Sequence, residues 1–341
     1  MSAALIYLYI LNQKAVSAMK EFKIEKNDAG QRLDRFVSKT VPLLPSSLMQ
    51  KYIRLKRIKL NGKGAKRDTR LCLGDAVQMY VNDEFFEKPT DCNSYLAITT
   101  PNVSVLYEDE NILLADKKPG MLCHSDGKWS YNTLIANIQA YLYQNGQWNP
   151  KDENSFAPAL CNRIDRNTGG IVIAAKNAES LRIINEKIKL REIDKLYLAV
   201  VCGKVSPKSA TLENQLFKDA KQNRVIVKRS PEPGSKTAIT KYRVLAERAG
   251  LTLVECELMT GRTHQIRAQM AHRGNPLLGD GKYGNDKVNR KYGEDGQLLY
   301  SYKLKFTFDT DAGMLNYLNG REFQATEIDF LRKYFPDFKI Y

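Results

Sequence analysis

Nine of the twenty residues from Lys51 to Arg70 are lysine or arginine, and Asp68 is the single acid among them. Charged side chains are almost never fully buried without a partner, so this segment must lie on an outer surface of the fold. Apolar residues recur through its first half at helical spacing, and Asn61-Gly62 is a typical two-residue hairpin turn. The segment therefore predicts a helix followed by a basic hairpin, with Ser46 or Ser47 as the helix cap.

A charge run of this kind has two interpretations. It can be a solvated helix face, which needs no partner. It can also be a binding surface for a polyanion, and the formal net charge of +15, with 53 lysines and arginines against 38 acids, favours a nucleic acid. In the second interpretation Lys51, Arg54, Arg57 and Lys59 contact phosphates, which supply affinity and positioning but little sequence information.

The length of 341 residues is about twice that of an average domain, and 43% of the residues are hydrophobic, so two folded units are expected. Mixed charge and turn residues at 83–102 mark the linker. The expected division is an uninformative tail or upstream start at 1–19, a small basic domain at 20–82, the linker at 83–102 and a large domain at 103–341.

The large domain alternates short β-rich runs with helical patterns. Strands are expected within 103–120, 170–177, 195–205, 237–259 and 300–308, and helices at 131–144, 178–190 and 324–334. Because several strands follow one another as hairpins, the pattern indicates an α+β fold on a mixed, largely antiparallel sheet with flanking helices.

Composition excludes some classes of protein. The six cysteines form no CxxC pair and only three histidines accompany them, so the spacing of a zinc site is absent and reduced thiols in the cytoplasm are expected. The sequence contains no run of eighteen apolar residues, the length that would be needed to cross a membrane. The apolar start of the chain lacks the preceding positive charge of a signal peptide.

Two polar stretches interrupt the apolar strands of the large domain. In the first, Asp165 lies between Arg163 and Arg166 in a turn that precedes an apolar strand. A lone aspartate in such a turn is either a catalytic carboxylate or, more often, a backbone cap or ion-pair partner. The second stretch follows another strand and includes Arg262 and Arg267. A separate strand carries Tyr197, which by itself is an ordinary core or half-buried residue.

Residues 31–63 resemble the S-four RNA-binding domain, in which a helix pair and a hairpin form a basic surface. In the large domain, Arg163-Ile164-Asp165, the Lys-x-Tyr that ends at Tyr197, and the stretch Gly261 to Arg267 resemble the RluA family of pseudouridine synthases in order and spacing. Lys118-Pro119-Gly120, Gly279-Asp280 and Tyr283-Gly284 also match that family. Two positions depart from the family pattern: Asn162 replaces a histidine, and Gly169 replaces a serine.

The resemblance implies a role for each matched residue. Asp165 would be the catalytic aspartate, Arg267 would hold it charged and correctly aimed, and Tyr197 would stack on the target base and relay a proton. Arg262 is expected to contact RNA phosphate. From their position on either side of Asp165, and not from the resemblance, Arg163 and Arg166 are expected to hold the phosphates of the flipped nucleotide.

The implied activity is isomerisation of uridine to pseudouridine in RNA, without a cofactor or a metal, by a monomer. The carboxylate would act either by covalent attack on the sugar or by helping to form a glycal. Large-subunit ribosomal RNA is the expected substrate and transfer RNA the next candidate. The alternative is a non-catalytic RNA-binding or ribosome-assembly factor. A phosphate-binding loop at 279–284 is rejected, because its glycines lack the required spacing.

Overall fold

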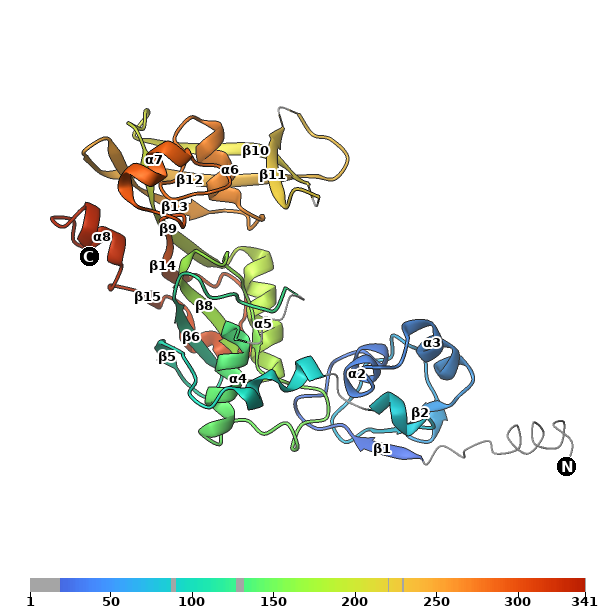
Figure 1. Ribbon diagram of the computed structural model, residues 1–341. Helices are drawn as coiled ribbons and strands as arrows, with labels where there is room; N and C mark the ends of the chain where they lie inside the picture. The colour runs from blue at the N-terminus through green and yellow to red at the C-terminus, as the bar shows by residue number, and fades with distance from the viewer. Residues whose placement is uncertain (1–18, 87–89, 127–131, 220, 229, 341) are drawn as a thin grey trace, which may run out of the picture. The chain divides into compact units, whose positions relative to one another are not determined.

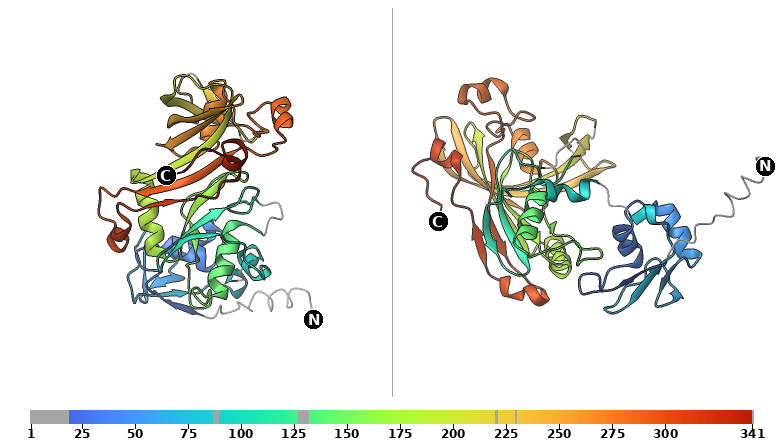
Figure 2. Two further views of the ribbon diagram at one scale, coloured as in Figure 1. Left: turned by 90° about the vertical axis from the view of Figure 1, so that its left-hand side faces the viewer. Right: turned by 60° about the horizontal axis from the view of Figure 1, so that its bottom comes forward.

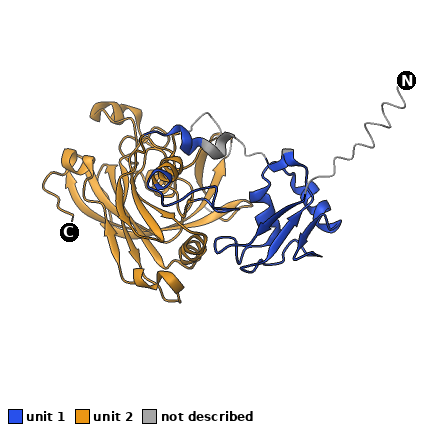
Figure 3. Cartoon of the chain, turned by 90° about the horizontal axis from the view of Figure 1, so that it is seen from below, with its two compact units in different colours: residues 1–99, 142–157 blue, residues 100–141, 158–341 orange. Residues whose placement is uncertain are grey.

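The computed structural model describes residues 19–86, 90–126, 132–219, 221–228 and 230–340 (Figure 1). The chain divides into two compact units, one of residues 1–99 and 142–157 and the other of residues 100–141 and 158–341 (Figure 3). The expected tail at 1–19 lies, apart from Met19, outside the described residues. No helix in the described ranges has the length and apolar character needed to cross a membrane.

The first unit is built on a four-stranded antiparallel sheet in the order β1-β4-β2-β3, with the helices α2 and α3. Its elements are β1 (Lys20–Lys23), α2 (Leu33–Thr40), α3 (Ser46–Arg54), β2 (Ile58–Leu60), β3 (Lys63–Gly64), β4 (Ala76–Met79) and the 3-10 helices η1 (Asp83–Phe86) and η2 (Thr90–Ala97). Leu33, Phe36 and Val37 on α2 are buried against Ile53 of α3, so the apolar spacing of both helices forms the core of this unit.

The predicted helix and hairpin are present. Asn61 and Gly62 both have positive φ, of 52° and 75°, as a tight turn between β2 and β3 requires. The predicted cap is wrong: Ser46 is already helical, and Pro45 is the residue before the helix, with its carbonyl accepting from Met49 N. Proline suits this position because it donates no backbone hydrogen bond and its φ is fixed.

Residues 142–157, which the sequence analysis places in the large domain, group with the first unit. The reason is a polar cluster around Asp28, whose side chain is buried. Asp28 accepts hydrogen bonds from Ser155 Oγ at 2.6 Å and from Asn154 Nδ2 at 2.8 Å, and Asn27 Nδ2 donates to Glu153 at 2.7 Å. The expected linker at 83–102 contains η1 and η2 instead of irregular chain alone.

The second unit contains one large sheet, of eleven strands among the described residues, in the order β11-β10-β12-β13-β9-β14-β8-β6-β5, with β15 beside β14 and β7 beside β8. All pairings are antiparallel except β14 with β8. The strands are β5 (Val105–Glu108), β6 (Ile112–Lys117), β7 (Ala159–Leu160), β8 (Gly169–Ala175), β9 (Ile193–Cys202), β10 (Ser209–Asp219), β11 (Arg224–Lys228), β12 (Ser235–Arg248), β13 (Leu251–Leu258), β14 (Leu299–Phe306) and β15 (Glu322–Gln324).

Helices flank the two halves of this sheet. They are α4 (Leu134–Gln144), α5 (Ala178–Leu190), α6 (Gln265–His272), α7 (Asp286–Tyr292), α8 (Asp329–Tyr334) and the 3-10 helix η3 (Gly313–Leu318). Helix α5 packs on β8, and α6 packs on β10, β11 and β12 (Figure 2). The expected α+β fold on a largely antiparallel sheet is confirmed.

Two details of the second unit differ from the sequence-based expectations. Strands β7, β10, β11 and β15 were not expected. The helix expected at 324–334 begins only at Asp329, because Glu322–Gln324 pair with β14 and Ala325 N donates to Tyr302 O. Backbone donors used in the sheet cannot also build a helical turn. Helix α5 has the expected bounds, 178–190.

Candidate active site

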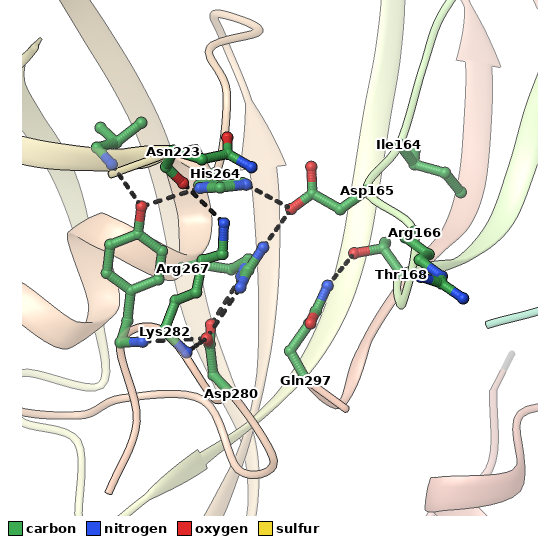
Figure 4. Close-up of polar contacts among 12 residues, drawn as sticks. Ile164, Asp165, Arg166, Thr168, Asn223, His264, Arg267, Asp280, Lys282 and Gln297 are labelled. Atoms are coloured by element: carbon green, nitrogen blue, oxygen red, sulfur yellow. Dashed lines mark hydrogen bonds and ion pairs between the residues drawn. The ribbon is translucent and has the colours of Figure 1, made fainter. Parts of the chain in front are cut away.

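Asp165 lies in the turn that joins β7 to β8. Thr168 N donates to the Asp165 carbonyl at 3.1 Å, and Gln297 Nε2 donates to Thr168 Oγ1 at 3.2 Å (Figure 4). One hydrogen bond within the turn and one from a buried side chain therefore fix its conformation. At Gly170, with φ of +112°, a side chain would place Cβ 2.2 Å from Ser301 O, so only glycine allows this close approach to β14. The Asp165 side chain is 27% exposed and is therefore accessible to a substrate.

Arg267 on α6 holds this carboxylate. Its Nη1 donates to Asp165 Oδ2 at 2.7 Å, while Nε and Nη2 donate to the two oxygens of Asp280 at 2.7 and 2.9 Å. Asp280 is fully buried and Arg267 nearly so. Because the bidentate pair with Asp280 fixes the guanidinium plane, the remaining edge of Arg267 points at Asp165 with little freedom.

The charges of this pair stabilise each other. Burial acts to lower the pKa of Arg267, but the hydrogen bonds and charge of Asp280 raise it above its usual value. Burial acts to raise the pKa of Asp280, but Arg267 and the backbone N–H groups of Lys282 and Tyr283 lower it. Both groups are therefore ionised at neutral pH, and one cation serves two carboxylates.

The loop before α6 is fixed on β12 by Gln265. Its side-chain oxygen accepts from Thr260 Oγ1 at 2.9 Å and from Arg262 N at 3.0 Å, and its Nε2 donates to Ile239 O at 3.0 Å. His264, directly before the helix, has φ of 51°, an uncommon conformation for a residue other than glycine. These contacts set where α6 begins and therefore where Arg267 lies.

Lys117 connects the Asp165 turn to a neighbouring loop. Its side chain is 1% exposed, and Nζ donates to the carbonyls of Lys118, Met121 and Arg166 at 2.9, 2.9 and 3.0 Å. Burial lowers the pKa of Lys117 to about 8, although Cys123 and Asp165 act to raise it. Three carbonyl acceptors match the three donors of an ammonium group, so Lys117 is a structural cation beneath the site.

Tyr197 lies on β9 in a hydrophobic cluster with Ile164, Ile266 and Leu299. The residue is 6% exposed, and burial raises the pKa of its hydroxyl to about 12, so the hydroxyl stays protonated at neutral pH. The structure thus brings Asp165, Arg267 and Tyr197 into one region from three separate elements.

The arginines expected to contact RNA are all exposed. Arg166 Nε donates to Gly120 O at 3.0 Å, and Arg262 Nε donates to Thr237 O at 3.0 Å, while both residues remain exposed. Arg163 is exposed as well. In the first unit, Lys51, Arg54 and Arg57 are exposed and Lys59 is partly buried.

Four residues of the site were given no role from the sequence: Lys117, His264, Asp280 and Tyr283. Asp280 is thirteen residues from Arg267, and no local pattern predicts their pairing. The matched stretches around Gly279-Asp280 and Tyr283-Gly284 were the available signal. A cavity of about 580 Å³ lies beside the turn, lined among others by Lys118, Asn167 and Gln297. Asp165 does not line this cavity.

The two departures from the family pattern have local explanations. Asn162 Oδ1 accepts from Ile173 N at 2.8 Å, so this side chain holds the turn against β8. A Cβ at Gly169 would lie 2.4 Å from the ring of Tyr300, whose hydroxyl donates to buried Asp116 at 2.6 Å. The tyrosine ring therefore occupies the space that a serine side chain would need.

Restoring the usual serine should therefore destabilise this protein. We expect Gly169→Ser to lower the free energy of unfolding by about 1–3 kcal/mol, because it overpacks a buried contact. Urea titration of Gly169→Ser, Tyr300→Ala and the double variant measures this. Gly169→Ser should lower the free energy of unfolding much less in the Tyr300→Ala background, because the clash with the tyrosine ring is then relieved. An equal decrease in both backgrounds would show that Tyr300 does not clash with the serine.

Comparison with known proteins agrees with the resemblance seen in the sequence. Residues 111–272 match the family described as RNA pseudouridylate synthase. The chain is 31% identical over 293 residues to an uncharacterized RNA pseudouridine synthase of Mycoplasma genitalium, covering 84% of this chain and 88% of that relative. It is 31% identical over 290 residues to ribosomal large subunit pseudouridine synthase C of Buchnera aphidicola, covering 83% and 88%.

A solved structure supports the fold. Human RNA pseudouridylate synthase domain containing 1 superposes with a TM-score of 0.50 at 19% identity, over 72% of this chain and 96% of that one. Members of the matched family act on RNA and are isomerases. By the extent and identity of these matches, the chain belongs to the RNA pseudouridine synthase family.

Proposed function

We propose that this enzyme isomerises specific uridines of large-subunit ribosomal RNA and that Asp165 is its catalytic carboxylate. The observation that carries the proposal is the contact between accessible Asp165 and buried Arg267, at 2.7 Å. A structural ion-pair partner of Arg267 is already supplied by Asp280, so Asp165 is not needed to neutralise that arginine. Relatives named for the ribosomal large subunit support the choice of RNA.

The reaction breaks the bond between uracil N1 and ribose C1′ and forms a bond between uracil C5 and the same C1′. The hydrogen at C5 leaves as a proton, and N1 gains one, so no oxidant or reductant is required. An ionised carboxylate can serve either by attack on C1′ or by removing the proton at C2′ to give a glycal. The protonated Tyr197 hydroxyl is our proposed partner for proton transfer, and its ring the surface for the base.

The base must leave its stack to reach a carboxylate set in a protein surface, which costs a few kcal/mol and favours loops and single strands. We assign Arg163, Arg166 and Arg262 to RNA phosphates, since each presents an exposed guanidinium. We propose that the enzyme acts as a monomer. The described cysteines are free thiols, in keeping with a reducing compartment such as the cytoplasm.

Tritium release tests this function directly. Ribosomal RNA carrying tritium at uridine C5 loses the label when the new bond forms at that carbon. Release by the enzyme from ribosomal RNA supports the proposal, and release from transfer RNA alone would replace the proposed substrate. Binding without release from either RNA would instead favour an RNA-binding or assembly factor.

We further propose that the first unit is an S-four-type RNA-binding module. Its support is the exposed basic surface of α3 and the following hairpin, where Arg57 lies over Tyr52 at 5.0 Å and Lys59 over Tyr80 at 5.3 Å. Surfaces that bind single-stranded nucleic acid combine cations for the phosphates with aromatic rings for the bases, and this surface has both kinds of group.

Neutralising this surface should weaken RNA binding without slowing chemistry. The variant replaces four cations by glutamine: Lys51, Arg54, Arg57 and Lys59. If each contacts one phosphate, the slope of log affinity against log salt falls by about 3 in total, because fewer counterions are released. Filter binding over a salt series measures the slope, and kcat at saturating RNA should stay the same.

The matched control replaces four exposed cations of the second unit by glutamine: Lys189, Arg191, Lys204 and Lys208. It changes net charge equally and should leave the slope nearly unaltered. An equal loss of affinity in both variants would show that the effect comes from net charge and not from the basic surface of the first unit. No loss in either would assign the basic surface to a solvated helix face.

A further inference from the structure

The hydroxyl of Tyr283 lies between a backbone donor and a ring nitrogen. Val225 N donates to Tyr283 Oη at 2.7 Å, and His264 Nδ1 lies 2.9 Å from the same oxygen. A backbone N–H can only donate, so the oxygen accepts from Val225 and its own hydrogen is available to Nδ1. Burial raises the pKa of Tyr283, so the hydroxyl carries this hydrogen at neutral pH.

This arrangement favours one tautomer of His264. A hydrogen bond donated by the Tyr283 hydroxyl to Nδ1 requires Nδ1 to be unprotonated, which places the ring hydrogen on Nε2. Burial lowers the pKa of His264, and the charges of Arg267 and Lys282 lower it further, while Asp165 acts in the opposite direction. The imidazole is therefore neutral and presents an N–H at Nε2.

The Nε2 atom faces the catalytic carboxylate. It lies 3.9 Å from Asp165 Oδ2, the same oxygen that accepts from Arg267 at 2.7 Å (Figure 4). The His264 side chain is 10% exposed, and its φ of 51° turns the chain sharply where α6 begins. Tyr283 supports both donors, because its ring also lies under the Arg267 guanidinium at 5.3 Å.

We propose that His264 is a positioning residue: held in the Nε2–H tautomer by Tyr283, it shares Asp165 Oδ2 with Arg267 and leaves Oδ1 as the oxygen that meets the ribose. The inference rests on the proposed role of Asp165. A separation of 3.9 Å is too long for a hydrogen bond, so the proposal requires this contact to shorten when RNA binds. Catalytic hydrogen bonds are often long without substrate and shorten in the complex.

Kinetics of three variants test the role. Asparagine tolerates positive φ but cannot reach Asp165, so His264→Asn removes the donor with little backbone cost. We expect kcat to fall about 10- to 100-fold, the loss of one hydrogen bond to a charged group, with KM changed less than about threefold. His264→Gln, whose amide N–H replaces Nε2–H, should recover part of this loss. His272→Gln, at the exposed end of the same helix, is the matched control and should behave as wild type.

The tautomer itself can be observed. The chain has three histidines, so the ¹⁵N spectrum of the imidazoles is small, and His264→Asn assigns the signals of His264. We expect hydrogen on Nε2 in the wild type and loss of this single tautomer in Tyr283→Phe, which keeps the ring under Arg267 and removes only the hydroxyl. Hydrogen on Nδ1 in the wild type would overturn the proposal.

The outcomes separate this inference from the proposed function. Asp165→Asn, assayed beside these variants, reports on the catalytic carboxylate alone. If Asp165→Asn is inactive while His264→Asn keeps full kcat, the positioning role is wrong and the proposed function stands. If His264→Asn raises KM with kcat unchanged, His264 binds substrate and does not position Asp165, which also overturns the inference.

Discussion

Asp165→Asn is expected to reduce uridine isomerisation by at least about 10⁴-fold while leaving RNA affinity nearly unchanged. The amide keeps the size of the carboxylate and one oxygen that can accept from Arg267. It removes the negative charge and the nucleophilic or basic oxygen that either chemical route needs. Because Asp165 is 27% exposed and Asp280 still pairs Arg267, the fold should tolerate the change.

The measurement combines tritium release with RNA binding on the same preparations of wild type and Asp165→Asn. Loss of release with retained binding identifies the carboxylate as chemical and not as a binding contact. Substantial release by Asp165→Asn would exclude it from the chemistry and would leave its ion pair with Arg267 as a structural feature. A parallel loss of binding and release would assign Asp165 to RNA recognition.

Arg267→Met is expected to lower the free energy of unfolding by about 3–5 kcal/mol and to abolish activity, because it leaves the Asp280 carboxylate buried without a partner. Arg267→Lys should be intermediate, since an ammonium cannot bind Asp280 through two parallel hydrogen bonds and also reach Asp165. Urea unfolding gives the stability, and tritium release gives the activity.

The double variant Arg267→Met/Asp280→Leu separates the two effects. Replacing a buried ion pair by apolar residues is often neutral for stability, so much of the lost stability should return. Activity should not return, because no cation then aims Asp165. Recovery of both would show that Arg267 serves the fold alone.

The pH dependence of stability follows from the same pair. The pKa of Asp280 is lowered from its usual 3.8 in the folded protein, so its contribution is complete above the unfolded value and is lost as pH falls through the folded one, below about 4. In Arg267→Met the pKa of Asp280 should instead rise above its unfolded value, because the buried carboxylate has no cation. The pH dependence then changes sign: the contribution of Asp280 is lost as pH rises through the folded pKa, and the variant should gain stability on acidification where the wild type loses it. Unfolding of both proteins between pH 3 and 6 measures the two opposite slopes.

Much of the fold was predictable because it follows from local patterns. The helix at 178–190 has apolar residues at regular spacing and a cap in which Asn177 accepts from Ser180 N at 2.8 Å. The turn at Asn61-Gly62 needs only two residues that accept positive φ. Prediction failed where a distant strand takes the backbone donors, as at 322–325, and where a polar cluster joins distant segments, as around Asp28.

For the site, the sequence by itself determined which groups are present. The resemblance placed a carboxylate at Asp165, a cation at Arg267 and a phenol at Tyr197, and the structure brings all three into one region. Their proposed catalytic roles stay predictions until the variants are measured.

Only the tertiary structure decided how these groups are held. The pairing of Arg267 with Asp280, the burial of Lys117 under three carbonyls and the contact of His264 with Tyr283 all depend on residues distant in sequence. Hydrogen-bond partners and burial depend on which atoms come into contact when the strands and helices pack together. No local spacing in the chain specifies those contacts.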